Sequence, residues 1–361
     1  MTYLLLILTI FTWPFGQLLA FQFPGFPVTF YLLDIVLGLL IISLILKKKH
    51  RLQIVSDPIF KPILIFNLVA VLSLLINFKS LAAGGFIYPL LYLGRLFIYP
   101  SAYWAIKAHS KKNILKLITI SFVLFCLLGI LQYLFLPDMR YLKLIGFDDH
   151  YYRLIGSLYD PNFTGAILAG ASLLFISLGS WAVSLPLVVL LALTFSRASY
   201  LCFLLGVIYL LISNKKYSLF FLLVCLGLLI WVIPKPFGEG VNLLRTFSIF
   251  SRIESWTVGI NLFLQKPLLG WGYNTLRSLA GDRFQIDNSY LFVAATTGFL
   301  GLLSFLSFLK KALNEIPLPS KLFILTILIH SLFNNSFFYI WINLAFWVML
   351  ALPLKEYKQE K

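Results

Sequence analysis

Long uninterrupted apolar runs constrain this chain more than any other feature of its sequence. Leu-rich blocks such as residues 114–136 match the roughly 20 residues that an α-helix needs to cross a bilayer. These blocks do not alternate with a period of two, as the strands of a membrane barrel would. Only 12% of the residues are charged, against about a quarter in soluble domains. The sequence therefore predicts an all-α, polytopic transmembrane helical bundle whose surrounding solvent is membrane lipid.

We expect about twelve spans, separated by short loops except at two places. The two long loops divide the chain into N-terminal transmembrane helices (1–136), a first long outer loop (137–160), central transmembrane helices (161–234), a large outer-face loop (235–287), and C-terminal transmembrane helices with a short cytoplasmic tail (288–361). The expected spans lie at 3–21, 28–46, 60–78, 86–106, 114–136, 161–178, 180–195, 198–213, 217–234, 288–309, 319–334 and 336–354.

Basic residues set the expected orientation, because each cluster follows an even-numbered span. The clusters are Lys47, Lys48, Lys49 and Arg51; Lys107, Lys111 and Lys112; Lys215 and Lys216; Lys310 and Lys311; and Lys355 and Lys358. The positive-inside rule places this side, and with it both termini, in the cytoplasm. We expect a multi-pass protein of the cytoplasmic (inner) membrane. The clusters account for much of the +16 net charge, and no soluble basic module indicates a nucleic-acid partner.

The large outer-face loop contains a helix signal. Ser251 and Glu254 have the spacing of a capping box, in which each side chain binds a backbone N–H at the start of a helix. Pro267 would end that helix. We expect a short amphipathic helix that lies on the outer membrane surface or over the mouth of the bundle. Its apolar residues at helical spacing are Ile253, Trp256, Ile260 and Phe263.

The outer segments are rich in arginine, which the positive-inside rule disfavours there. They contain Arg140, Arg153, Arg245, Arg252, Arg277 and Arg283, and Arg197 stands at the outer end of a span. Taken singly, each is a solvated surface charge in a loop long enough to escape the rule. The alternative is that they form a cationic site for an anionic substrate, because the guanidinium fork grips phosphate bidentately. Arg197 fits best, since Ser196 could cap a helix whose free N–H groups face the same anion.

Several segments in the second half carry recognisable motifs. In chain order they are Arg153–Asn162 with Arg-x-x-Gly and Pro-Asn, Thr194–Ala198 with Thr-x-Ser-Arg, Arg252 with Trp256, Pro267–Gly272, Asp287–Leu291 and Gly298–Leu302. Taken together, these segments resemble the O-antigen ligase and polymerase family of bacterial glycan assembly. The resemblance covers roughly residues 150–305 and depends on the joint order of the segments rather than on any one of them.

This resemblance implies a membrane glycosyltransferase that acts at the outer face. Its donor would be a polyprenyl-diphosphate-linked glycan and its acceptor a hydroxyl of a glycan or glycolipid, with no cofactor and no metal. Arginines would hold the diphosphate and stabilise the charge that develops as it leaves. The matching positions for donor and substrate binding are Arg197, Arg252, Arg153, Ser196, Asn288 and Tyr290.

One position departs from the family pattern. Ligases of the family carry His before the Asn-x-Tyr-Leu segment, and this chain carries Asp287. An ordinary aspartate pKa near 4 makes a weaker base at neutral pH, although desolvation could raise it. We expect Asp287 to be the general base, to cap the span that starts at Asn288, or to do both. The substitution leaves polymerase and ligase open.

Other polar groups leave alternatives. Asp148, Asp149 and His150 are adjacent, and adjacent residues seldom complete a metal site, so we expect none; His150 either helps to bind the acceptor or is solvated in its loop. Within the spans, Asp34 and Arg95 either pair with each other or Arg95 lines the glycan or diphosphate cavity. His330 is expected to be packed and hydrogen-bonded.

A second class of function fits the same layout. Intramembrane charges among about twelve spans also describe a secondary transporter or exporter of a lipid-linked glycan. Transporters typically show internal repeats and bind their substrates near the midplane. The halves of this chain show no evident repeat, and its unusual residues gather toward the outer face. The sequence therefore favours the glycosyltransferase.

Overall fold

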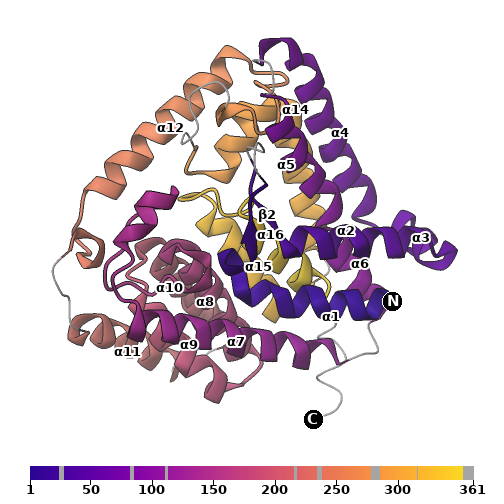
Figure 1. The fold of residues 1–361 in the computed structure, drawn as a ribbon. Coiled ribbons are helices and arrows are strands. Elements are labelled where there is room, and N and C mark those ends of the chain that lie inside the picture. Colours follow the sequence, from indigo (N-terminus) through magenta and orange to yellow (C-terminus); the bar gives the residue numbers. More distant parts are fainter. Residues whose placement is uncertain are drawn as a thin grey trace.

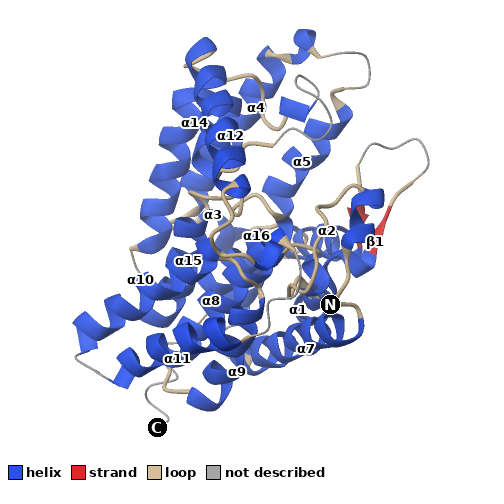
Figure 2. Ribbon diagram, turned by 90° about the vertical axis from the view of Figure 1, so that its left-hand side faces the viewer, coloured by secondary structure: helices blue, strands red, loops and turns tan. Residues whose placement is uncertain are grey.

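The computed structural model describes residues 1–23, 28–81, 85–109, 113–214, 218–233, 238–277, 285–314 and 316–352. Among the residues singled out above, Lys111, Lys112, Lys215, Lys216, Arg283, Lys355 and Lys358 lie outside the described residues. The regular secondary structure of the described part is helical, apart from a two-residue antiparallel pair of strands, β1 (Ala20–Phe21) and β2 (Phe30–Tyr31) (Figure 2).

Every expected span corresponds to a helix. The helices are α1 (Thr2–Thr12), continued by a 3-10 helix at Trp13–Leu19, α2 (Leu32–Ile45), α4 (Phe60–Ile76), α5 (Ile87–Ile98), α6 (Ser101–Ala108), α7 (Ile114–Phe135), α8 (Pro161–Ser177), α9 (Trp181–Leu193), α10 (Arg197–Asn214), α11 (Ser218–Val232), α14 (Ser289–Leu313), α15 (Leu318–His330) and α16 (Ile340–Leu350). Two further helices, α3 (Lys48–Val55) and α12 (Phe247–Gln265), lie in the connections. Short 3-10 helices occur at Phe78–Ser80, Arg140–Ile145, Gly156–Leu158 and Glu239–Val241.

Fewer helices are long enough to cross a membrane completely than the sequence predicts. In the described part, three helical segments are long and apolar enough to cross a membrane, or up to four if the bent α3–α4 pair is counted as one span. Several other apolar helices are shorter, at 10–17 residues. Backbone breaks explain part of the difference: Pro100 separates α5 from α6 within one expected span, because proline lacks the N–H that would continue the helix. The count of about twelve is therefore not confirmed.

The helix α8 forms the centre of the bundle. It packs against α9, α10 and α15, and nearly all its residues are buried. Glycines permit this close packing, because a Cβ at Gly170 would overlap the Phe323 ring and one at Gly165 would overlap Ser199. Elsewhere α14 packs against α4 and α12, and α1 packs against α2 (Figure 1). This packing fixes the N-terminus of α8 next to the start of α10.

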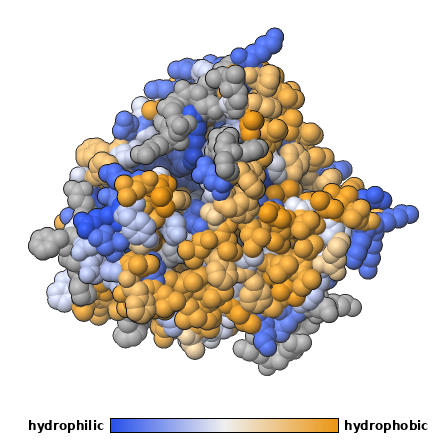
Figure 3. All heavy atoms as spheres, in the orientation of Figure 1, coloured by the Kyte–Doolittle hydropathy of each residue, from blue (hydrophilic) through white to orange (hydrophobic). Residues whose placement is uncertain are grey.

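The exterior is apolar over much of its area. Leucines of α7 such as Leu127, Leu131 and Leu134 are exposed, as are many large apolar residues of α2 and α4. In the view of Figure 3, hydrophobic surface covers the lower and central part, and hydrophilic residues gather toward the left and at the right-hand end. A surface of this kind requires lipid rather than water as its solvent. The chain is an integral membrane protein.

The helix in the large outer-face loop is longer than predicted. α12 begins at Phe247, and Thr246 at its N-cap makes no side-chain cap bond, so the capping box at Ser251 and Glu254 is wrong. The helix starts one turn earlier, where the Arg197 guanidinium binds the Ser248 hydroxyl. It ends at Gln265, before Pro267 as expected. α12 runs along one edge of the molecule, whereas α3 projects from the opposite edge (Figure 1).

The apolar stripe predicted for this helix does not form its buried face. Ser255 and Gly259 are the buried positions of α12, and a Cβ at Gly259 would press against Ile286. Ile253 and Ile260 point outward and are about half exposed, at 51% and 45%. The inward face of α12 is thus formed by small residues that allow a close approach, and the exposed face is apolar.

Two glycine-containing segments interlock at the far end of α12. The Phe299 N–H donates to the Pro267 carbonyl at 2.7 Å, and the Trp271 N–H donates to the Ala295 carbonyl. Gly298 interrupts α14 with a φ of 68°, and a Cβ there or at Gly270 would overlap the facing backbone. The residues Pro267–Gly272 and Gly298–Leu302 therefore have a structural role, fastening α12 to α14.

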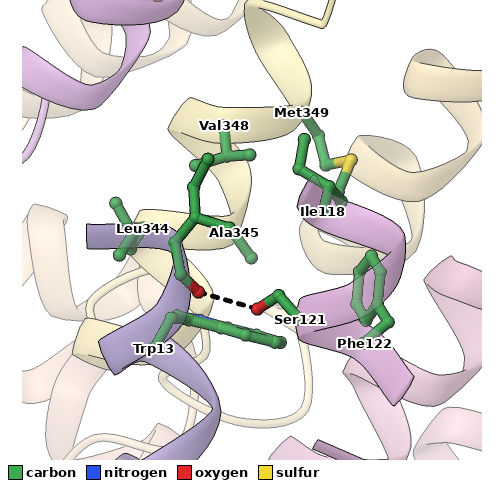
Figure 4. Close-up of a pocket in the computed structure, with 9 residues that line it drawn as sticks. Trp13, Ile118, Ser121, Phe122, Leu344, Ala345, Val348 and Met349 are labelled. Atoms are coloured by element: carbon green, nitrogen blue, oxygen red, sulfur yellow. Dashed lines mark hydrogen bonds between the residues drawn. The ribbon is translucent and has the colours of Figure 1, made fainter. Parts of the chain in front are cut away.

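A small cavity lies between α1, α7 and α16. Its volume is about 30 Å³, and apart from Ser121 its labelled lining residues are apolar (Figure 4). The Ser121 hydroxyl is already used, because it donates to the Ile10 carbonyl at 2.7 Å. A space of this size and character is a packing void, not a binding site for a glycan.

Candidate functional site

Four arginines from separate segments form the candidate site: Arg153 in the first long loop, Arg197 at the start of α10, Arg245 before α12, and Arg252 within α12. Burial and then Arg245 lower the pKa of Arg153 to about 9. Burial, then Arg197 and Arg252, lower the pKa of Arg245 to about 10. Guanidinium groups that lower each other's pKa lie close together. The fold thus gathers into one cluster four of the arginines that the sequence spreads over 100 positions; we call these four residues the arginine cluster.

The turn between α9 and α10 anchors two members of the cluster. Arg153 donates from Nε to the Thr194 carbonyl at 2.9 Å and from Nη2 to the Phe195 carbonyl at 3.3 Å. Arg245 donates from Nη2 to the same Phe195 carbonyl at 3.1 Å. Phe195 is buried and has a φ of 50°, a conformation that costs a bulky residue free energy. This strained turn presents one carbonyl to two guanidinium groups.

The other two members hold α12 against the bundle. Arg197 donates to the carbonyls of Leu243 and Arg245 and to the Ser248 hydroxyl at 2.6 Å. Arg252 donates from Nε to the Phe333 carbonyl at 2.7 Å and from Nη2 to the Asn334 amide oxygen at 3.3 Å. The first half of α12 is therefore tied to α10 and to the segment that follows α15.

The charge of the arginine cluster is not neutralised by a contacting carboxylate. Among the described residues, the ion pairs are Arg95–Asp34, Lys107–Asp57 and Arg140–Asp138. The cluster instead donates to neutral carbonyl, hydroxyl and amide oxygens. Such bonds satisfy N–H donors but leave the positive charge in place, and partly buried like charges repel one another. The cluster has the electrostatics of a site for an anion.

Two helix N-termini meet beside the cluster. The Asp160 carboxylate caps α8 by accepting from the backbone N–H groups of Asn162 and Phe163. Ser196 caps α10, as predicted, by accepting from the Ser199 N–H at 3.4 Å. The Ser196 hydroxyl also donates to the Asn162 side-chain oxygen at 3.1 Å, which links the starts of the two helices. The positive ends of both helices add to the potential of the arginines.

Asp287 lies beside Arg252 with a carboxylate that accepts no hydrogen bond from the described residues. Its backbone is fixed: its N–H donates to the Ser255 hydroxyl, and its carbonyl accepts from the Trp256 indole at 2.9 Å. Burial raises the pKa of Asp287 to about 6, and the opposing influence of Arg252 is smaller. The carboxylate titrates close to neutral pH, the range in which a general base works best.

The cap of α14 is Asn288 and not Asp287. The Asn288 side chain accepts from the backbone N–H groups of Tyr290 and Leu291 and donates to the Leu332 carbonyl at 3.0 Å. The alternative that Asp287 caps this helix is therefore wrong, because the next residue already occupies the N-cap position. Tyr290 points away from the cluster, with its hydroxyl donating to the Leu328 carbonyl of α15. Asn288 and Tyr290 are thus both held by helix packing.

His150 is buried beside the cluster rather than solvated. Its Nε2 atom has no hydrogen-bond partner in the described part of the chain, which overturns the solvated-loop alternative. Burial, then Arg153 and Arg245, lower the pKa of His150 to about 3, so the imidazole is neutral at physiological pH. Asp148 and Asp149 are exposed. Among the described residues, no group of three His, Cys, Asp or Glu side chains is placed to hold a metal ion.

Arg95 lies apart from the cluster, in a closed ion pair. Its Nε and Nη2 atoms donate to the two carboxylate oxygens of Asp34 at 3.0 and 2.7 Å, and the Tyr99 hydroxyl donates to the same carboxylate. Of the two alternatives, the structure shows the pairing of Asp34 with Arg95; the expectation that Arg95 lines the glycan or diphosphate cavity is not supported, because its guanidinium is occupied by Asp34 and the Thr29 carbonyl. His330 is packed as expected, with Nδ1 2.6 Å from the Ser336 hydroxyl.

Sequence reasoning missed three members of the site. Arg245 appears among the outer arginines but was assigned no role, and Asn162 and Asn334 were not selected. Asn162 carries a readable signal, because it follows Asp160 and Pro161 at the start of a span. Nothing in the sequence marks Asn334, which reaches Arg252 only through the turn after α15.

Comparison with known proteins agrees with this region. Residues 182–306 match the family model described as O-Antigen ligase. The match contains Arg197, Arg245, Arg252 and Asp287 and begins after Arg153. No curated protein matches the chain. The resemblance to the O-antigen ligase family that the sequence motifs indicate is confirmed.

Proposed function

We propose that this chain, whose residues 182–306 match the O-antigen ligase family, is a metal-independent membrane glycosyltransferase. It moves a glycan from a polyprenyl-diphosphate carrier to an acceptor hydroxyl at the outer face of the cytoplasmic membrane, as an O-antigen polymerase or ligase. The observation that carries the proposal is the arginine cluster, which lies beside Asp287 and contacts no carboxylate within the described residues. A diphosphate supplies the negative charge that this cluster lacks.

The arginines retain donors for the diphosphate. A guanidinium has five N–H groups, and described residues accept from Nε and Nη2 of Arg153 and from Nη1 and Nη2 of Arg197. Within the described residues, no acceptor contacts the Nη1 atom of Arg153 or the Nε atom of Arg197. In this proposal Arg197 and Arg252 bind the diphosphate directly. Arg153 and Arg245, which are bound to the α9–α10 turn, add positive charge. Ser196 caps the adjacent start of α10.

Asp287 serves as the general base in the proposed reaction. The acceptor hydroxyl gives its proton to the Asp287 carboxylate while its oxygen attacks the anomeric carbon of the donor glycan. The bond between that carbon and the diphosphate oxygen breaks, and polyprenyl diphosphate leaves with the electron pair. The arginine cluster stabilises the negative charge that develops on the leaving group. The pKa of about 6 for Asp287 suits this proton transfer better than the pKa of about 3 for His150.

The exposed apolar face of α12 suits a lipid-linked donor. Phe247 and Phe250 are exposed next to Ser248, whose hydroxyl is bound by Arg197. Charge and apolar surface therefore adjoin at the start of α12, as the diphosphate and the prenyl chain do in the donor. A transporter would need its charged site near the midplane of the spans, whereas these arginines lie in loops, at a helix start and on α12.

The test is a transfer assay with purified protein in lipid vesicles. We expect a polyprenyl-diphosphate-linked glycan to be converted to longer chains, which identifies a polymerase, or to be moved to an added glycolipid acceptor, which identifies a ligase. The Asp287→Asn variant, which lacks the proposed general base, is the matched control. Movement of the intact lipid-linked glycan between leaflets without any new glycosidic bond would support the transporter and contradict the enzyme.

Orientation is tested separately. Because α3 and α12 lie on opposite sides of the molecule (Figure 1), we propose that α3 and both termini face the cytoplasm and that α12 faces outward. In a variant without the natural cysteines, a membrane-impermeant maleimide should label Phe250→Cys in intact cells. It should label Lys48→Cys only after permeabilisation. Labelling of the cysteine at position 48 in intact cells would contradict this orientation.

A further inference from the structure

One face of α12 contacts both the arginine cluster and the segment that carries Asp287. Four positions share that face by their helical spacing: Arg252, Ser255, Trp256 and Gly259. The first belongs to the arginine cluster, and the other three contact residues 285–287. A single helix therefore joins the proposed diphosphate site to the proposed general base.

Two side chains of this face bind the backbone of Asp287. The Ser255 hydroxyl accepts from the Asp287 N–H at 2.8 Å and donates to the Gln285 carbonyl at 3.2 Å. The Trp256 indole donates from Nε1 to the Asp287 carbonyl at 2.9 Å. Both polar groups of the Asp287 main chain are thus fixed by α12, while the carboxylate accepts no hydrogen bond from the described residues and stays available for a proton.

The turn after α15 closes a ring of contacts around this segment. The Asn288 side-chain amide donates to the Leu332 carbonyl at 3.0 Å, and Arg252 donates to the Phe333 carbonyl of the same turn at 2.7 Å. The ring runs from α12 to the segment before α14, then to the turn after α15, and back to α12. A closed ring of this kind holds the base and one diphosphate-binding arginine in a fixed relation.

α12 does not need Ser255 or Trp256 to stay attached to the bundle. Its start is bound by Arg197 through the Ser248 hydroxyl, and beyond its other end the Pro267 carbonyl accepts from the Phe299 N–H. The two side chains in the middle of the helix instead act on the backbone of the base. This arrangement indicates a role in placing Asp287 rather than in fastening the helix.

We propose that Ser255 and Trp256 are positioning residues, which hold Asp287 at a set place relative to the diphosphate bound by Arg252. The inference rests on the proposed function and adds the residues that align its two halves. The acceptor hydroxyl must lie between the base and the anomeric carbon when the diphosphate leaves. A misplacement of about 1 Å can cost about a hundredfold in rate.

The experiment compares Trp256→Phe with Trp271→Phe in the transfer assay. Each variant loses one indole hydrogen bond of 2.9 Å to a backbone carbonyl, but the Trp271 indole donates to Leu262 and not to Asp287. Trp256→Phe should lower turnover about tenfold or more and leave the KM for the lipid-linked donor within about twofold, since the arginine cluster is intact. Trp271→Phe should lower the melting temperature by a similar amount and keep both kinetic constants.

The pH profile distinguishes misplacement of the base from loss of folded protein. Burial raises the pKa of Asp287 to about 6, and the charged groups that act on it are Arg252 of α12, Asp160 at the start of α8 and Asp148 in the first long loop. A loosened carboxylate gains water, which returns its pKa toward the ordinary value near 4. The acid limb of activity should therefore move to lower pH in the Trp256 variant and not in the control. A smaller amount of folded enzyme would lower the rate equally at every pH.

Ser255→Ala gives a second test, which decides the question if Trp256→Phe does not fold. It should show the same loss of turnover and the same movement of the acid limb. Its control, Thr257→Ala, removes an exposed hydroxyl that is bonded within α12 and should behave as the wild type does. An active wild type with turnover and acid limb unchanged in both the Trp256 and the Ser255 variants would overturn this inference alone. A wild type that forms no glycosidic bond would contradict the proposed function, and this inference with it.

Discussion

Arg95 and Arg197 show how the same side chain acquires different roles in one molecule. Arg95 faces Asp34 with two hydrogen bonds of 3.0 and 2.7 Å, and its charge is neutralised within the fold. Arg197 donates to two backbone carbonyls and to a hydroxyl, and no carboxylate of the described residues contacts it. The first arrangement joins α2 to α5. The second fixes the direction of a guanidinium while its charge stays available.

The difference extends to the neighbours of each arginine. Three more arginines surround Arg197, and burial with mutual repulsion lowers the pKa values of Arg153 and Arg245. An uncompensated buried charge is strongly destabilising, and the neighbouring carboxylates of Asp160 and Asp287 act on these arginines without forming an ion pair with them. The free energy that is lost there would be recovered when an anion binds. An arginine that is paired with a carboxylate, such as Arg95, therefore makes a structural contact. An arginine without a contacting carboxylate in the described residues, such as Arg197, belongs to the proposed substrate site.

The largest effect is expected for Asp287→Asn. Loss of the general base should lower turnover about a hundredfold or more, while the fold is preserved because Asn288 supplies the cap of α14. Turnover is measured in membranes with expression matched to the wild type. Asp138→Asn is the control, since Asp138 is an exposed carboxylate paired with Arg140. Turnover near that of the wild type would leave Asp287 without a catalytic role and would direct attention to His150.

Arg197→Lys should reduce transfer about tenfold to a hundredfold, because lysine keeps the charge but loses the planar fork. The matched control is Arg95→Lys, which should lower the melting temperature of the protein and leave the KM for the lipid-linked donor unchanged. The measurement compares the KM for the donor, the turnover and the melting temperature of the two variants with those of the wild type. The same pattern in the two variants would erase the distinction between a paired and an unpaired arginine.

Transfer should also depend on pH through Asp287. Its pKa is raised to about 6, so the carboxylate is the active, deprotonated form above pH 6 and is lost below it. Activity should therefore fall about tenfold between pH 7 and pH 5. His150 cannot produce this limb, because its pKa is lowered to about 3 and it stays neutral over the whole range. A profile that is flat from pH 5 to 7 would contradict the assignment of the base.

The smallest expected effect is that of chelation. If the arginine cluster alone stabilises the leaving group, EDTA should not change the transfer rate. The measurement compares turnover with and without EDTA and after addition of single divalent ions. Loss of activity that one ion restores would show that fixed cations are insufficient, and it would make Asp148 and Asp149 the first candidates for ligands.

The sequence predicts some parts of this molecule better than others. Hydropathy locates a helix in each expected span, because burial in lipid requires long apolar runs, but it does not give the number of complete crossings. It does not locate the break at Pro100 or the earlier start of α12, where Ser248 accepts a hydrogen bond from the distant Arg197. Asp287 and Asn288 are both good capping residues, so the sequence cannot decide which of them caps α14.

The site was predicted in its chemistry more than in its geometry. Arg197, Arg252 and Arg153 do lie together, as expected for a cationic site. Their hydrogen bonds to backbone carbonyls could not be predicted, because the partners come from distant segments. The clearest case is Phe195, whose left-handed backbone at a φ of 50° turns one carbonyl toward Arg153 and Arg245. Phenylalanine carries no sequence signal for such a turn.

The most direct test of the central claim is calorimetric binding of farnesyl diphosphate, a short polyprenyl diphosphate, to the purified protein. The wild type should bind it more tightly than farnesyl monophosphate, and added salt should weaken the binding. The double variant Arg197→Gln with Arg252→Gln should lose at least about tenfold in affinity, whereas Arg140→Gln, which removes an exposed arginine already paired with Asp138, should bind as the wild type does. Equal affinity of the double variant and the wild type for the diphosphate would contradict the assignment of the arginine cluster as its site.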